Sequence, residues 1–274
     1  MITADLHTHT LYSHGKDTPA DMFAAAQAKG ITLYGFTEHS PRPLGYDYTR
    51  EYREHLTRHY PDYVREVREL QTQHPGQVLL GMEMDWMEKE LPFIQTSIHA
   101  YDFDYLIGSV HFLQHWGYDD TIADWKNLTP AQCAQHYEAY FRTLRRMVES
   151  GLFQIAGHLD LIKIFSVDTF RAWLDVDAHM ALVRDVLLAL RDAGMAMEIS
   201  SAGLRKPCKE IYPGPKIMAL AAEIGVDICL SSDAHNVHDV ANAFDQLEAY
   251  ARSYGYDHSV WFCKGQRFER PFDA

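Results

Sequence analysis

The sequence predicts a single-domain α/β barrel, for two reasons. Its 274 residues are enough for one such barrel, a fold that commonly takes about 250 residues. Short apolar runs rich in β-branched and aromatic residues alternate with longer segments of helical periodicity, as in parallel strands joined by helices. No linker-like composition, internal repeat or abrupt change in composition interrupts the chain, so we expect residues 1–274 to form one domain.

Seven apolar runs are the predicted strands, and five longer segments are the predicted helices. The strands are residues 2–5, 33–37, 78–81, 105–110, 154–157, 197–200 and 227–231. The helices are residues 19–29, 60–73, 130–149, 176–193 and 214–224, several of which open with Pro, Asp or Thr, as helix starts commonly do. Residues 41–59 and 116–127 are predicted to be long loops that shape a substrate pocket. The apolar run 260–263, in the tail 259–274, is expected to add a strand or a packing arm.

The composition excludes several classes of partner. A formal net charge of −13 argues against sequence-independent binding to nucleic acid or to an anionic membrane, because both require a basic face. The N-terminal residues lack the pattern of a secretory signal, and no apolar run reaches the length of a membrane span, so we expect a cytoplasmic protein. The four cysteines form no CxxC pair, which predicts neither disulfides nor a thiolate zinc site.

Metal-binding side chains follow six of the seven predicted strands. The motifs are Asp-Leu-His-Thr-His at residues 5–9, Thr-Glu-His at 37–39, Gly-Met-Glu at 81–83, Gly-Ser-Val-His at 108–111, Gly-His-Leu-Asp at 157–160 and Ser-Ser-Asp-Ala-His at 231–235. In a barrel of parallel strands all of these ends lie on the face where active sites are built. Imidazole and carboxylate ligands without cysteine suit zinc, manganese or iron.

The spacing within the motifs supports shared ligation. His7 and His9 are two residues apart, so in an extended strand end both side chains point the same way. The same spacing aligns Asp233 with His235, and a carboxylate such as Glu83 can bridge two ions. A lone histidine after a strand is more often a structural residue, so the prediction depends on the conjunction of six motifs.

In chain order the motifs are HxH, a further His, EH, a lone Glu, a lone His, GH and DxH. This order resembles the polymerase-and-histidinol-phosphatase (PHP) superfamily over nearly the whole chain. The longer strings Phe-Thr-Glu-His-Ser-Pro at 36–41, Gly-Met-Glu-Met-Asp at 81–85 and Gly-Leu-Arg-Lys-Pro at 203–207 resemble its histidinol-phosphatase branch. The resemblance implies a distorted (β/α)7 TIM-like barrel with three divalent metal ions at the C-terminal face of the strands.

The resemblance also implies how the ligands divide among the ions. The first ion is expected to be bound by His7, His9, Glu83 and Asp233. Glu83 is expected to bridge to a second ion bound by His111 and His158, and His14, His39 and His235 are expected to bind the third. His14 differs from the others because it lies in a loop and not at a strand end.

Two basic residues are candidates for binding a phosphate. Lys163 lies five residues after His158, and Arg205 lies five residues after the predicted strand that ends at Ser200. The planar guanidinium of arginine can bind two phosphate oxygens at once, whereas lysine acts as a point charge. Relatives often have arginine where Lys163 stands. The alternative for either residue is a surface salt bridge.

The expected reaction is hydrolysis of a small phosphate monoester by metal-activated water, with Asp233, His235 or a metal-bound water as the general acid. The resemblance implies L-histidinol phosphate as substrate, and hence a step in histidine biosynthesis. Acidic and aromatic loop residues are the candidates for contacting its alcohol part, namely Tyr46, Asp47, Tyr48, Glu210 and Tyr212.

Two alternatives stay open. One is a related phosphoesterase that acts on a nucleotide, a nucleic-acid end or phosphotyrosine, of which nucleic acid is disfavoured by the acidic charge. The other is a catalytically silent metal-binding subunit, which the complete ligand set disfavours.

Overall fold

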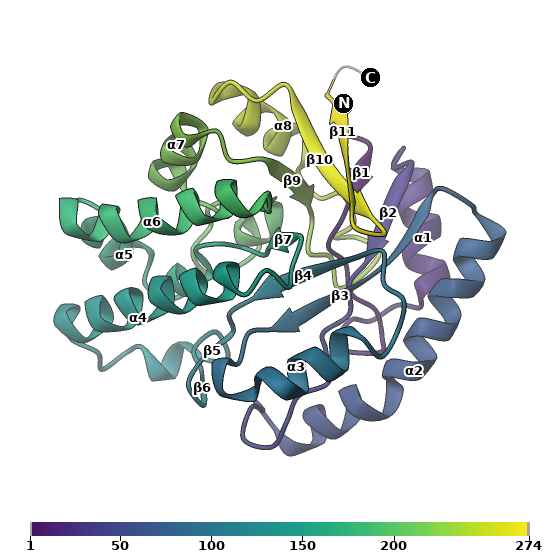
Figure 1. The fold of residues 1–274 in the computed structure, drawn as a ribbon, viewed down its shortest axis with the longest axis horizontal. Helices are drawn as coiled ribbons and strands as arrows, with labels where there is room; N and C mark the ends of the chain where they lie inside the picture. Colours follow the sequence, from purple (N-terminus) through teal and green to yellow (C-terminus); the bar gives the residue numbers. More distant parts are fainter. Residues whose placement is uncertain (1, 273–274) are drawn as a thin grey trace.

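Seven parallel strands form a nearly closed barrel in the computed structural model, which describes residues 2–272. Figure 1 shows the helices lying around the outside of the strands. The order of the strands is β1 (Ala4–Asp5), β2 (Leu33–Phe36), β3 (Val78–Asp85), β4 (Tyr105–Ser109), β7 (Ile155–Ala156), β8 (Ala196–Ser200) and β9 (Ile228–Ser231). Each pair of neighbouring strands in this order is hydrogen-bonded and parallel. The predicted α/β barrel and its seven strands are therefore confirmed.

The ring closes where β1 meets β9, and it does so through the residues just beyond these strands. Leu6 N donates to Leu230 O at 3.3 Å, and His9 N donates to Ala234 O at 2.8 Å. Thr8 and Ala234 also form an isolated parallel bridge. This closure places the first and last of the predicted metal-binding motifs side by side, although they are more than 220 residues apart in the sequence.

The helices are α1 (Pro19–Ala28), α2 (Arg50–Gln73), α3 (Leu91–Ile98), α4 (Pro130–Glu149), α5 (Val167–Trp173), α6 (Asp177–Ala193), α7 (Pro215–Ile224) and α8 (Phe244–Ser253). The five predicted helices are all present. Thr129 begins α4 with a reciprocal capping box to Gln132, and left-handed glycines end α6 and α7. Among the described helices, none combines the length and the apolar character needed to cross a bilayer.

The prediction of a loop over residues 41–59 is wrong for the second half of this range, which is helical. The helix α2 begins at Arg50, where Thr49 accepts a hydrogen bond from the backbone N–H of Tyr52, and it continues through Pro61 to Gln73. Leu56 and Tyr60 on this stretch are buried, so the early turns are anchored by packing. The helices α3, α5 and α8 were not predicted.

The barrel interior is filled by side chains, with Tyr105 of β4 crossing it. Tyr105 Oη donates to Leu6 O at 2.6 Å. A Cβ atom at Gly35 would lie 2.0 Å from that hydroxyl oxygen, and one at Gly81 would lie 3.1 Å from Tyr105 Cζ. Glycine at position 35 of β2 is therefore what leaves room for the Tyr105 hydroxyl group, while at Gly81 of β3 the closest clash would be with Thr37 Cγ2 at 2.7 Å.

A C-terminal hairpin closes the N-terminal end of the barrel. The strands β10 (His258–Cys263) and β11 (Gln266–Pro271) pair antiparallel with each other. Val260 and Phe262 of β10 are buried and belong to the same apolar cluster as Leu33 and Tyr105. The apolar run 260–263 is thus a strand, as predicted, but it packs across the barrel (yellow in Figure 1) and does not join its sheet. The last two residues of the predicted tail lie outside the described residues.

Candidate metal centre

Glu83 lies at the centre of the predicted ligands. The strand β3 extends to Asp85, so Glu83 belongs to the strand and does not follow it. Its Oε2 lies 3.4 Å from His7 Nε2, 3.5 Å from His9 Nε2 and 2.8 Å from His39 Nδ1. Its Oε1 lies 2.9 Å from His158 Nε2 and 3.6 Å from His111 Nε2. The two carboxylate oxygens thus face two different sets of imidazoles, which is the arrangement that a bridging ligand needs.

Three overlapping groups of side chains have their donor atoms within 4.8 Å of one another. They are His7, His9 and Asp233; His9, His39 and His235; and His39, Glu83 and His111. The nitrogens His7 Nε2, His9 Nε2 and His235 Nε2 are buried and have no hydrogen-bond partner. Buried polar atoms are rarely left unpaired, and unpaired imidazole nitrogens converging with carboxylates are the donor set that a divalent cation fits.

Two of the predicted ligands lie at the edges of this cluster. His158 follows β7 and reaches Glu83 Oε1, as described above. His14 is exposed on the loop after β1, with its ring centroid 4.1 Å from that of His235 and its Nδ1 3.0 Å from Tyr52 Oη. His14 is not a member of the three-donor groups, although the fold brings it to the same end of the barrel as the other eight ligands.

Behind the histidines lie two buried carboxylates that the sequence did not single out. Glu198 of β8 accepts hydrogen bonds from His7 Nδ1 at 2.6 Å, His158 N at 2.5 Å and Ser231 Oγ at 2.6 Å. Burial tends to raise the pKa of the Glu198 carboxyl, but His7 and His158 outweigh burial and hold this pKa below its ordinary value. A carboxylate that accepts from Nδ1–H leaves the Nε2 lone pair of His7 free for a metal.

Asp85 is the carboxylate partner of His111, as Glu198 is of His7. Its Oδ1 lies 2.5 Å from His111 Nδ1, and its Oδ2 lies 2.5 Å from Arg42 Nε. Burial tends to raise the pKa of Asp85, but Arg42 and His111 hold it below its ordinary value. The sequence carries no motif for either role, because Glu198 and Asp85 are single carboxylates whose neighbours in the strand are apolar.

A pocket of about 360 Å³ opens beside the cluster. Seven of the predicted ligands contribute to its wall, namely His14, His39, Glu83, His111, His158, Asp233 and His235. The remaining wall residues are Tyr48, Thr49, Tyr52, Asp119, Asp120, Leu161, Ile164 and Lys206. The predicted loop 116–127 therefore shapes the pocket, through Asp119 and Asp120.

Neither predicted phosphate-binding residue belongs to this wall. Lys163 is fully buried, with its Nζ 2.8 Å from Asp160 Oδ2 and 2.7 Å from Glu210 Oε2. Arg205 Nη2 donates to Ser232 O at 2.7 Å and to Asp233 O at 3.1 Å, while its Nη1 is buried without a partner. Arg205 therefore contacts the backbone of the loop that contains Asp233. The charge of Lys163 is neutralised by ion pairs inside the protein. The alternative considered for Lys163 was a surface salt bridge. The structure shows a salt bridge, but it is buried.

Of the residues predicted to contact the alcohol part of a substrate, only Tyr48 lines the pocket. Tyr46 and Tyr212 are buried. Asp47 pairs with Arg53 at 2.9 Å, and Glu210 pairs with Lys163. The acidic side chains of the wall come instead from Asp119 and Asp120.

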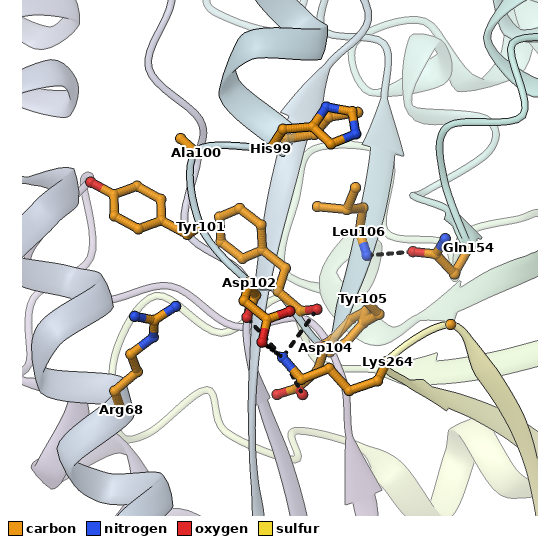
Figure 2. A pocket seen from close by; sticks show the side chains of 13 residues that line it. Arg68, His99, Ala100, Tyr101, Asp102, Asp104, Tyr105, Leu106, Gln154 and Lys264 are labelled. Atoms are coloured by element: carbon orange, nitrogen blue, oxygen red, sulfur yellow. Dashed lines mark hydrogen bonds and ion pairs between the residues drawn. The ribbon is translucent and has the colours of Figure 1, made fainter.

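A larger hollow of about 650 Å³ lies where β4 begins, away from the metal-binding motifs. Figure 2 shows Lys264 reaching Asp102 and Asp104, with Arg68 and Tyr101 across from them. None of the three-donor groups found in residues 2–272 lies here. The smaller pocket, beside the predicted ligands, is therefore the candidate active site.

Comparisons with a family model, with curated sequences and with solved structures all found proteins of the PHP and histidinol-phosphatase type. The model of the PHP domain family matches residues 5–202. A protein of Deinococcus radiodurans named "Probable histidinol-phosphatase" is 34% identical over 92% of this chain and 93% of its own length. The histidinol-phosphatase of Saccharomyces cerevisiae is 23% identical over 89% of this chain and 88% of its own length. The structure of histidinol phosphate phosphatase from Lactococcus lactis, complexed with zinc, L-histidinol and phosphate, superposes with a TM-score of 0.76 at 19% identity, covering 97% of this chain and 98% of that one.

Proposed function

Because the chain belongs to the PHP domain family, we propose that it is a metal-dependent histidinol-phosphatase, which hydrolyses L-histidinol phosphate to L-histidinol and phosphate. The observation that carries the proposal is the position of Glu83, whose two oxygens face separate sets of histidines beside a pocket. The Deinococcus relative, which spans nearly the whole chain, supports the choice of substrate. The reaction is a late step of histidine biosynthesis, and we propose that it takes place in the cytoplasm.

We propose that the chain binds three divalent ions, zinc, manganese or iron. His7, His9, Glu83 and Asp233 are proposed to bind the first, Glu83, His111 and His158 the second, and His14, His39 and His235 the third. Divalent ions in such a site act as Lewis acids toward the phosphoryl group and make water a nucleophile at neutral pH.

The remaining steps are assigned to side chains of the protein. Glu198 and Asp85 fix the tautomers of His7 and His111 through the contacts described above. Asp233 and His235 line both the cluster and the pocket, and the pKa of each is held below its ordinary value, for Asp233 against the effect of burial by His235 and His7, and for His235 by burial and His9. We therefore propose that they orient a water that gives a proton to the departing alcohol oxygen, and that neither is itself the source of the proton. Arg205 is proposed to bind the phosphate through Nη1, which is buried and has no protein partner. We also propose that residues 1–274 work as one domain.

The pocket favours a small substrate. A volume of about 360 Å³ suits a compact monoester and is at the low end for ligand sites. Asp119 and Asp120 in its wall suit the ammonium group of histidinol, and they would repel the backbone of a nucleic acid.

The test is phosphate release from L-histidinol phosphate beside a panel of monoesters, which includes a nucleotide and phosphotyrosine, together with elemental analysis. We expect the highest kcat/KM for histidinol phosphate and close to three ions per chain. A higher kcat/KM for another monoester would refute the proposed substrate, and a content near one ion per chain would refute the proposed three-ion cluster.

Arg205→Ala should lower kcat/KM at least tenfold, because it removes a charged partner of the phosphate. A smaller effect would mean that Arg205 serves only its contacts with Ser232 O and Asp233 O.

A further inference from the structure

The wall of the metal pocket contains one lysine or arginine side chain among its described residues, and it is Lys206. This residue follows a short 3-10 helix (Ser201–Leu204) that continues from β8. Its backbone is held at both ends, because Lys206 N donates to Gly203 O at 3.2 Å and Lys209 N donates to Lys206 O at 3.1 Å. The loop is packed tightly, since a Cβ at Gly203 would lie 1.9 Å from Glu210 O. Lys206 is therefore presented to the pocket from a fixed loop.

Three other cations near this end of the barrel have partners in the protein, although Arg205 Nη1 and both Nη atoms of Arg42 are buried without a hydrogen-bond partner. Lys163 is paired with Asp160 and Glu210, and Arg205 donates to two backbone carbonyls. The Arg42 guanidinium is buried over the ring of Tyr48, 4.9 Å from its centroid, and is paired with Asp85. Lys206, by contrast, has no ion-pair partner within residues 2–272, and it is only partly buried.

The pocket needs such a charge. Glu83, Asp119, Asp120 and Asp233 all contribute carboxylates to the wall, and a phosphate dianion is repelled by each of them. The ions would offset part of this repulsion, but their charge is shared with the carboxylates that bind them. An ammonium without a protein partner at the rim is a phosphate-binding group that needs no rearrangement of the protein.

We propose that Lys206 binds a non-bridging oxygen of the phosphate of the substrate, at the rim of the metal cluster; this assignment rests on the proposed phosphatase function. Asp119 and Asp120 come from a different loop, so the pocket offers an ammonium and a pair of carboxylates on separate elements. A substrate with a phosphate at one end and a cationic group at the other would be oriented by these two sets of charges.

The test compares Lys206→Met, Lys206→Arg and the control Lys209→Met in metal-loaded protein. Lys209 is on the same loop and is exposed, but it does not line the pocket. Binding of inorganic phosphate is measured by calorimetry, and metal content and thermal unfolding are measured alongside. We expect Lys206→Met to weaken phosphate binding about tenfold or more, as for the loss of a charge-assisted hydrogen bond. Lys206→Arg should retain most of the affinity, and Lys209→Met should match the parent. A phosphate affinity of Lys206→Met within twofold of the parent would overturn the proposal.

Activity provides a second and independent arm. Because every monoester shares the phosphate, Lys206→Met should lower kcat/KM by a similar factor for histidinol phosphate and for p-nitrophenyl phosphate. A loss confined to histidinol phosphate would place Lys206 against the alcohol part and would also overturn the proposal. If the parent protein binds phosphate through Lys206 but does not hydrolyse histidinol phosphate, the proposed function fails and the assignment of Lys206 stands.

Discussion

Replacing Glu198 by glutamine should weaken metal binding, although the two side chains have nearly the same shape. Glu198 Oε1 accepts from His7 Nδ1 and Ser231 Oγ, and Oε2 accepts from His158 N. Glutamine offers one acceptor oxygen and one NH2 donor. With its oxygen toward His7, the NH2 group faces the backbone N–H of His158, and two donors meet. With its oxygen toward His158, the NH2 group faces His7 Nδ1, which must then lose its proton to Nε2, the nitrogen that should bind the metal.

Both orientations therefore carry a defect whose size can be stated. An unpaired buried donor costs about 1–3 kcal/mol, so the metal-free variant should unfold with a free energy lower by that amount. Changing the carboxylate partner of a metal-binding histidine typically lowers metal affinity by about 10–100-fold, and we expect a loss in this range for the ions that His7 and His158 are proposed to bind.

The assay is competition with a chelator of known affinity, and urea unfolding of the metal-free protein serves as the measure of stability. Ile199→Val is the matched control, because Ile199 is the next residue of β8 and packs in the outer apolar core. It should cost about 0.5–1.5 kcal/mol of stability and leave metal affinity unchanged. A metal affinity of Glu198→Gln within twofold of the parent would refute the argument about the His7 tautomer.

Three other substitutions test separate parts of the structure. Glu83→Gln should abolish turnover and keep the fold by circular dichroism, since it removes the anion between two sets of histidines; full activity with the metals retained would disprove bridging. Lys163→Met should lower the free energy of unfolding by about 3–5 kcal/mol, because Asp160 is left buried without its cation, and phosphate affinity should not change; a weakened phosphate affinity would return Lys163 to the pocket. Phe262→Ala should cost about 3–5 kcal/mol in urea unfolding, and a cost below 1 kcal/mol would show that the hairpin does not seal the barrel.

The sequence was sufficient to predict the barrel because two independent patterns coincide in it. The apolar runs mark the strands, and the His, Asp and Glu residues that follow them mark a common face. Glu83 shows the limit of this reasoning, because it was expected after β3 and lies within the strand. Its inward direction follows from strand periodicity in either case, so the error in the boundary did not affect the site.

The directions of long side chains could not be predicted in this way. Lys163 and Arg205 have suitable distances from strand ends in the sequence, but a flexible cation turns toward whichever anion or carbonyl the fold brings near. For Lys163 one such partner is Glu210, which is 47 residues away in the sequence, and only the three-dimensional structure reveals it. Glu198 was missed for a different reason. It is a single carboxylate inside an apolar strand, and no motif surrounds it.

The C-terminal hairpin has a consequence for how the chain is made. Arg270 Nε of β11 donates to Thr3 Oγ1 at 2.7 Å, so two residues 267 positions apart are in contact. During synthesis, all seven barrel strands leave the ribosome before Val260 and Phe262 can cover the interior. Until then the apolar floor of the barrel is open to solvent, and such long-range contacts form slowly. A premature stop codon just before the hairpin would leave every proposed metal ligand in the chain and still release a protein prone to aggregation.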